Sequence, residues 1–297
     1  MRNRLNALLL AVVGLGAVFA GHAAEPRPIA ASTQTAASRF AHHSAGKYFQ
    51  FHGDIAPQRL ALYAALSDMF VELVEQDFFR VRTRFPIQAF VLPDKAQFQR
   101  FLRTTYGVTM PSEYGMYLAE AGVFVTYDGS GLGTFTHEIM HPLVEESLPA
   151  RPEWAIEGIP AFFEKFYGHV QGGQLHVQWG YQNPWRIERL GPGLRQLKLA
   201  RIVTGSQDTS EKRLVTVFLY QKGKLKRFLE LVQADEHRGF RTHLEAAFEK
   251  PLNEIEEDWQ NYLQEIERNR QQIMTLPSSQ LFDTPEQYRS FERHFGL

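Results

Sequence analysis

The sequence contains no cysteine among its 297 residues. Disulfide bonds, thiolate metal ligands, a cysteine nucleophile and a lipid-modified N-terminal cysteine are therefore all excluded. The chain also lacks an excess of charge of either sign, because 32 lysine and arginine residues stand against 33 aspartate and glutamate residues, for a net charge of −1. No basic stripe is present that would attract a phosphate backbone, so nucleic acid is not an expected partner.

Long apolar runs are also scarce, and the one that stands out extends from Leu5 to Ala20. Arg2 and Arg4 precede it, and the small-residue stretch Gly21–Ala24 follows it. This order is typical of a cleavable signal peptide. The run is shorter than the roughly 20 residues that a spanning helix needs, so an uncleaved anchor is the alternative and the mature chain is expected to have no membrane span. We therefore expect an exported protein, periplasmic or secreted, and the absence of cysteine favours the bacterial periplasm.

The remaining composition, with 44% apolar and 13% aromatic residues, is that of a folded chain. Alternating apolar residues predict strands at 48–52, 87–92, 115–118 and 121–127 and a hairpin at 168–179. Apolar residues at helical spacing predict helices at 57–78, after residue 94, around a pair of histidines, at 152–166 and through most of the rest. A mixed sheet followed by helices predicts an α+β fold.

We expect the chain to be organised along its length without a linker between its two main halves. The expected parts are a signal peptide at 1–24, a flexible leader at 25–46, a sheet-bearing metal-binding half at 47–180, a helical half at 181–270 and a C-terminal tail at 271–297. The oligomeric state is not predicted.

The histidine pair lies in the run THEIMH, which ends at His141. On a helix, His137 and His141 share one face and can present both imidazoles to one ion, while Glu138 is turned slightly aside toward a water. Zinc lowers the pKa of such a water from about 16 to near 7, and a neighbouring carboxylate can take its proton. This spacing predicts a Zn²⁺ site with Glu138 as the general base. Thr134 is expected to cap the helix.

A catalytic zinc ion needs three protein ligands and one open position. Glu157 is the expected third ligand, because the turn around Pro149 and Pro152 lets the following helix return against the first. Among the other acids nearby, Glu145 and Glu146 lie on the other side of a proline from Glu157, and Glu164 is two turns further on. The competing acids are Glu145, Glu146, Glu153 and Glu164.

The runs His137–His141 and Trp154–Gly158, together with Glu164, resemble the gluzincin metallopeptidases, which include thermolysin-like and aminopeptidase-N-like enzymes. The closer resemblance is to the peptidase-MA-like domains of exported bacterial proteins, and it extends over about residues 47–265. It implies a zincin-like fold, with His137, His141 and Glu157 as zinc ligands and Glu138 as general base. It also implies that the strand Ala121–Tyr127 is the sheet edge along which an extended peptide binds.

The resemblance further implies that Glu164 orients a ligand imidazole, although a surface acid on an amphipathic helix is an equal alternative. Three positions differ from the family pattern. Pro142 and Pro160 interrupt the hydrogen bonding of the two metal helices and predict kinks close to the metal. Thr209 stands near the place of the family's oxyanion-stabilising tyrosine. The residues considered as its replacement are Tyr181, Tyr220, His169 and His176, and none is assigned.

These observations predict a zinc-dependent peptidase that hydrolyses peptide bonds in a peptide or protein substrate. The three departures favour an alternative, a zinc-stabilised peptide- or protein-binding domain with weak or lost catalysis.

Overall fold

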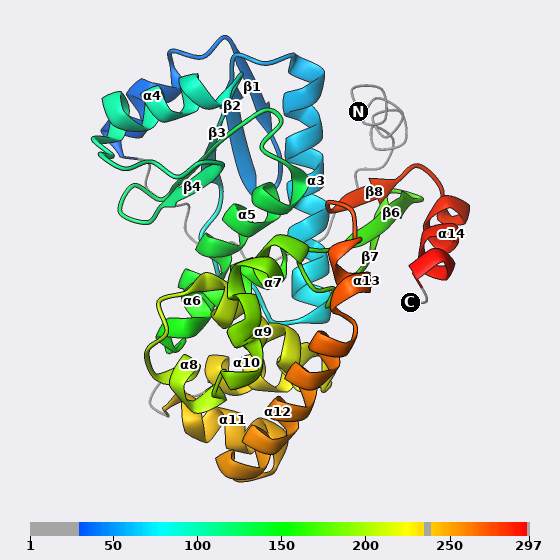
Figure 1. The fold of residues 1–297 in the computed structure, drawn as a ribbon. Helices are drawn as coiled ribbons and strands as arrows, with labels where there is room; N and C mark the ends of the chain where they lie inside the picture. Colours follow the sequence, from blue (N-terminus) through cyan, green and yellow to red (C-terminus); the bar gives the residue numbers. More distant parts are fainter. Residues whose placement is uncertain (1–29, 235–238, 296–297) are drawn as a thin grey trace.

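The computed structural model describes residues 30–234 and 239–295, so the signal peptide expected at 1–24 lies outside the described residues. The fold is α+β. Figure 1 shows a sheet-containing part above a helical part, with a long helix running beside the sheet and reaching down toward the helices. Among the described residues, no helix is both long and apolar enough to cross a bilayer.

The main sheet has five strands in the order β1-β2-β3-β5-β4. Its strands are β1 (His42–Ala45), β2 (Phe49–Gly53), β3 (Ile87–Leu92), β4 (Gly115–Leu118) and β5 (Val123–Tyr127). The three inner strands are parallel, and the two outer strands pair antiparallel to their neighbours. The strand β1 and the helix α2 (Ala31–Ala37) lie in the segment expected as a flexible leader.

Both faces of this sheet are covered, which explains why all six residues of β3 are buried. Ala89 and Val91 belong to a core cluster on one side with α3 (Pro57–Asp77). Phe90 and Leu92 face the other side, where they join residues of α4 (Lys95–Tyr106). Alternate side chains of β3 therefore pack into two different hydrophobic clusters, and neither face of the strand is exposed to solvent.

The expectation that the strand at 121–127 forms the sheet edge is wrong. β5 lies between β3 and β4, and β4 is the edge strand on that side of the sheet. The chain forms β4 first and turns back through residues 119–122, so that β5 pairs with β3 on its other side. A sheet order depends on which distant strand each segment pairs with, and local alternation does not contain that information.

Two helices below the sheet carry the expected metal ligands: α5 (Leu132–Ser147) and α6 (Glu153–Phe162). α5 begins directly after Gly131, so Thr134 lies within the first turn and is not the cap that was expected. Each helix contains a buried proline, Pro142 in α5 and Pro160 in α6, and each continues past it.

The helical part packs around α6 and α9 (Thr209–Gln221). Its other helices are α7 (Pro184–Leu190), α8 (Leu199–Gly205), α10 (Leu225–Ala234), α11 (Phe240–Phe248) and α12 (Leu252–Arg268), with a 3₁₀ helix at Gly191–Gln196. Gly223 lies between α9 and α10.

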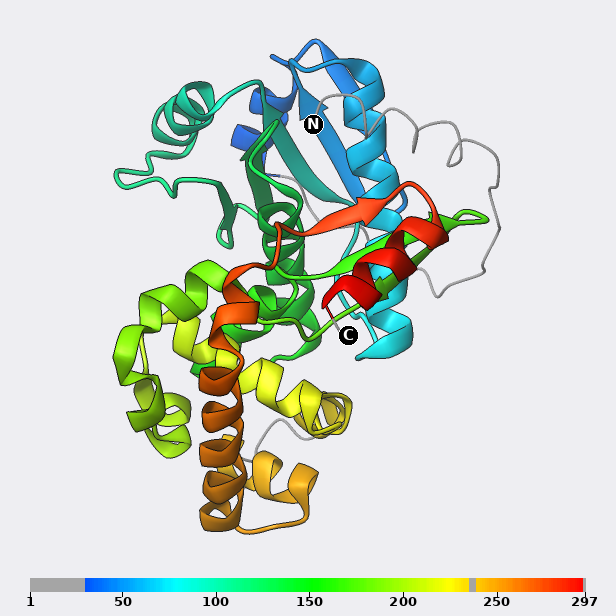
Figure 2. The ribbon, with the colours of Figure 1, turned by 45° about the vertical axis from the view of Figure 1, so that its right-hand side comes forward.

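The C-terminal residues return to the middle of the molecule. α13 (Arg270–Met274) leads to β8 (Gln280–Phe282), which pairs in parallel with β6 (Tyr167–Gln171) in a second sheet of order β7-β6-β8. β7 (Gln174–Gln178) forms the expected hairpin with β6, and α14 (Pro285–Phe295) packs beside it. Figure 2 shows this red segment lying across the green hairpin. The segment expected as a tail thus contributes a strand to a sheet.

Candidate metal centre

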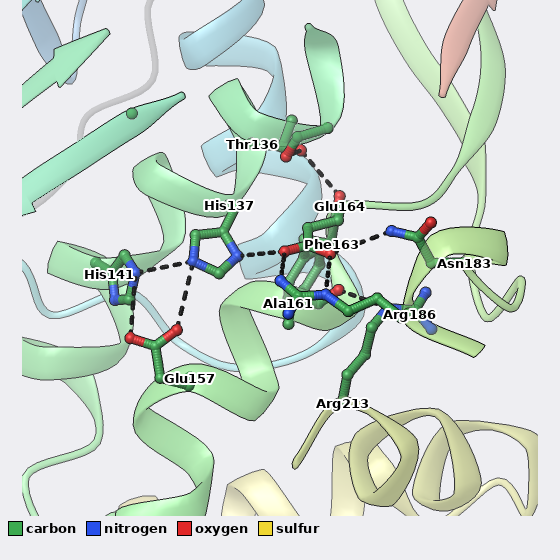
Figure 3. Close-up of polar contacts among 12 residues, drawn as sticks. Thr136, His137, His141, Glu157, Ala161, Phe163, Glu164, Asn183, Arg186 and Arg213 are labelled. Carbon is green, nitrogen blue, oxygen red and sulfur yellow. Dashed lines mark hydrogen bonds and ion pairs between the residues drawn. The ribbon is translucent and has the colours of Figure 1, made fainter. Parts of the chain in front are cut away.

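Three of the residues expected from the sequence converge between α5 and α6 (Figure 3). The Nε2 atoms of His137 and His141 lie 3.1 Å apart. Glu157 places Oε2 at 3.6 Å from His137 Nε2 and Oε1 at 4.0 Å from His141 Nε2. One donor atom from each residue lies within 4.8 Å of the others, so this group can hold a metal ion.

The packing of the helices brings these side chains together. Ile139, Met140 and Leu143 of α5 are fully buried in the core, which fixes the orientation of the helix and of the histidines that it carries. On α6, a Cβ at Gly158 would lie 2.8 Å from the carbonyl oxygen of Lys212 in α9. The absence of a side chain at Gly158 therefore allows α9 to pack closely behind the residue that presents the carboxylate.

Glu164 contacts the first of these histidines, and its Oε1 lies 2.9 Å from His137 Nδ1. Arg186 Nη2 lies 2.5 Å from the same oxygen, Arg186 Nε donates to Oε2 at 3.1 Å, and Asn183 Nδ2 donates to Oε2 at 3.2 Å. The alternative that Glu164 is a surface acid is wrong, because its side chain is only 9% exposed. Burial alone would raise the pKa of Glu164, but His137 and Arg186 lower it to about 2.

Two hydrogen bonds fix the chain that leads to Glu164. Thr136 Oγ1 in α5 donates to the carbonyl of Phe163 at 2.8 Å, and the buried Arg213 donates through Nε to the carbonyl of Ala161 at 2.8 Å (Figure 3). The last carbonyls of a helix have no N–H donor within the helix, so the side chains of Thr136 and Arg213 supply hydrogen-bond donors at the end of α6. The carboxylate beside His137 is thereby held from both α5 and α9.

Glu138 is 7% exposed and lies against the edge strand β4. A Cβ at Gly115 would lie 2.8 Å from its Cγ, and the backbone N–H of Tyr117 donates to its carboxylate. Burial raises the pKa of Glu138 to about 7. The ring of Tyr117 stacks on His141 with a centroid separation of 6.1 Å, so β4 touches both the expected base and a candidate ligand. Burial, together with the charge of His137, lowers the pKa of His141 well below its usual value.

The other acids that were considered as the third metal ligand lie elsewhere. Glu146 accepts a hydrogen bond from the backbone N–H of Arg84, and Glu153 accepts one from Gln207. Glu145 lines the same cavity as the histidines, but its carboxylate is not part of the metal-binding group. Of the five acids considered, Glu157 alone joins the group, as expected.

A cavity of about 1230 Å³ contains the site, between β4, α5, α6 and α7. Among the described residues, five large apolar side chains are exposed, and three of these line the cavity: Tyr114, Ile156 and Trp185. Thr209 also lines it, whereas the four residues considered as oxyanion donors do not. Tyr181 donates to Gln178, Tyr220 packs on Phe78, and His169 stacks on His176.

Sequence reasoning missed three residues of the site: Tyr117, Lys165 and Arg186. Each lines the cavity, but none has a fixed spacing from the histidines that would indicate a role. The only available signal was for Lys165, a lysine next to the acid Glu164 within a strongly apolar stretch.

Neither the protein-family models nor the curated proteins compared with this sequence match it.

Proposed function

We propose that this chain is a zinc-dependent peptidase of the gluzincin type with a zincin-like fold. The observation that carries the proposal is the convergence of His137, His141 and Glu157 beside a buried Glu138 and the edge strand β4. Two imidazole nitrogens and one carboxylate oxygen are a donor set that suits catalytic zinc. The depressed pKa of His141 fits this role, because a ligand imidazole must be unprotonated.

Zinc held by these residues would supply a Lewis acid that polarises a water and the substrate carbonyl. Glu138 takes the proton of the attacking water and passes it to the leaving amine nitrogen. Glu164 fixes the ring of His137 through Nδ1, and Arg186 keeps that carboxylate ionised. β4 is an edge strand of the main sheet, and an extended peptide could lie along it.

The test uses the full chain, its zinc content and a broad peptide library. We expect one equivalent of zinc and hydrolysis that a chelator abolishes. Glu138→Gln should retain zinc and lose at least about a hundredfold in kcat/KM, because it removes the base without removing a ligand. Glu145→Gln, which alters an acid of the same cavity outside the metal-binding group, is the matched control and should keep nearly full activity. Zinc-loaded protein without any hydrolysis would refute the proposal.

A second candidate is a zinc-stabilised peptide- or protein-binding domain. It is favoured by one observation, that Tyr181, Tyr220, His169 and His176 all lie outside the cavity lining and cannot serve as oxyanion donors there. In that case zinc-loaded protein binds peptides without hydrolysing them, and Glu138→Gln leaves the binding unchanged. We also propose export of the chain, which cell fractionation tests.

A further inference from the structure

One end of the metal cavity is formed by a segment from near the C-terminus. We define Leu276–Ser279 as the C-terminal strap; Leu276, Ser278 and Ser279 line the cavity. The Pro277 carbonyl accepts hydrogen bonds from Lys165 Nζ and from Tyr167 Oη, the latter at 2.6 Å. The strap then continues into β8, which is paired with β6. Figure 2 shows the chain crossing from α13 to β8 at the junction of the two parts of the molecule.

The strap lies at the end of the cavity next to the start of α5. Ser279 Oγ donates to the carbonyl oxygen of Glu164 at 2.5 Å, and a Cβ at Gly133 would lie 2.3 Å from that same oxygen. The side chain of the same residue, Glu164, reaches His137, with Oε1 at 2.9 Å from Nδ1. The opposite end of the cavity is near the end of α5, where Arg151 donates to the carbonyl of Glu145.

The direction in which β4 runs indicates which end of the cavity the C-terminus of a bound peptide would face. A Cβ at Gly115 would lie 3.1 Å from Thr134 Cγ2, whereas the ring of Tyr117 lies over His141. β4 therefore runs in the same direction as α5, away from the strap. A peptide that lies along β4 in the antiparallel direction would run the opposite way and point its C-terminus at the strap.

The charge at the strap end agrees with this direction. Lys165 is 3% exposed, and no carboxylate of the described residues lies within 4 Å of its ammonium group, which has the Pro277 carbonyl as its hydrogen-bond acceptor. The nearest acid in sequence, Glu164, is already paired with Arg186 and His137. Burial, and to a smaller extent the positive charge of Arg213, lower the pKa of Lys165. An incoming carboxylate favours the charged form of this ammonium group and so offsets that effect. A carboxylate is attracted to such an end, and an N-terminal ammonium is repelled.

We propose that the strap end of the cavity receives the free C-terminal carboxylate of the substrate, with Lys165 as the residue that selects it. The inference rests on the proposed peptidase function and makes the enzyme one that removes short C-terminal fragments. Water adds across the scissile bond: the C–N bond breaks, the carbonyl carbon gains a hydroxyl oxygen, and the amine nitrogen gains a proton. The strap contacts Glu164, which in turn contacts His137. At about 3.3 Å per extended residue, we therefore expect room for only about three substrate residues on this side.

The experiment compares two N-acetylated ten-residue peptides of one sequence, one with a free C-terminus and one with a C-terminal amide, on zinc-loaded full chain. We expect kcat/KM for the acid to exceed that for the amide at least tenfold, and mass spectrometry to find C-terminal fragments of about three residues or fewer. Equal rates for the two peptides, or cleavage far from the C-terminus, overturn the inference while the peptidase proposal stands. Hydrolysis of neither peptide overturns this inference, and it refutes the peptidase proposal as well only when the peptide library is also left intact.

A pair of variants assigns the selection to one residue. Lys165→Met should bring the acid-to-amide ratio toward one by lowering the rate on the acid. The control Lys222→Met, at an exposed lysine at the end of α9, should keep the wild-type ratio. An unchanged ratio in Lys165→Met overturns the role of this lysine. If Lys165→Met does not fold, the comparison of acid and amide on the wild-type chain still decides the inference.

Discussion

At the scale of single residues, the candidate centre depends on how one buried carboxylate is neutralised. Glu164 contacts His137 on one side and the guanidinium of Arg186 on the other. Arg186 binds through two nitrogens, which fixes the plane of the carboxylate as well as its charge. The imidazole that contacts this carboxylate is thereby held in one orientation, with Nδ1 toward Glu164 and Nε2 toward Glu157.

Replacement of this arginine should weaken metal binding without removing a ligand. In Arg186→Met, Glu164 loses its bidentate partner and no longer fixes His137, so we expect zinc affinity to fall by about 10- to 100-fold. Competition with a chromogenic chelator measures this. Arg189→Met, at an exposed arginine on the same helix, is the control and should keep its affinity within about twofold. An unchanged affinity in Arg186→Met would show that Glu164 is oriented without it.

The ligands were predictable from sequence because their geometry is local. Four residues separate His137 from His141, and this spacing alone places both on one helical face. Glu157 followed from a short connection between two helices. Arg186 was not predictable, because only the packing of α7 against α9 and α13 brings it to Glu164.

At the scale of the elements, α5 and α6 show how packing overrides local preference. Pro142 and Pro160 each remove a backbone donor, yet both helices continue past them and bury the prolines in the core. The existence and order of most elements followed from apolar spacing. The sheet order did not, and β5 was wrongly expected at the edge, because strand pairing is set by contacts between segments far apart in sequence.

The contact between α6 and α9 should be intolerant of one added methyl group. In Gly158→Ala, the new Cβ would lie 2.8 Å from the backbone carbonyl of Lys212, which cannot rotate away. We expect the free energy of unfolding to fall by about 1–3 kcal/mol. Chemical denaturation measures this change. At Gly205, the last residue of α8, a Cβ would meet nothing within 4 Å, so Gly205→Ala should be neutral or stabilising. Equal stability of the two variants would contradict this account of the packing.

At the scale of the whole molecule, the C-terminal residues connect the second sheet to the metal cavity. β8 pairs with β6, and Pro277 lies against Lys165 and Tyr167 at the start of that strand. The sequence indicated a tail at 271–297 because its polar residues obscure the short strand. Its location was not predictable, since the contact joins residues that are 112 positions apart.

The buried ammonium at this junction should make the stability of the folded chain depend on pH. Burial, with a smaller effect from Arg213, lowers the pKa of Lys165 from 10.5 to about 7. Between these values the unfolded chain holds a proton that the folded chain releases, so raising the pH stabilises the fold. Below pH 7 both states are protonated and the destabilising effect of burial is complete.

We therefore expect the unfolding free energy of the wild type to rise relative to that of Lys165→Met as the pH increases from 7 to 10. The slope is at most about 1.4 kcal/mol per pH unit. Urea denaturation of both proteins at several pH values measures the difference, and Lys222→Met serves as the control whose difference from the wild type stays nearly constant. The metal-free protein is used, so that the titration of Lys165 is separated from zinc binding. A difference that is constant across this range, or one that falls, would mean that Lys165 remains protonated in the folded chain and that the Pro277 carbonyl is sufficient to hold its charge.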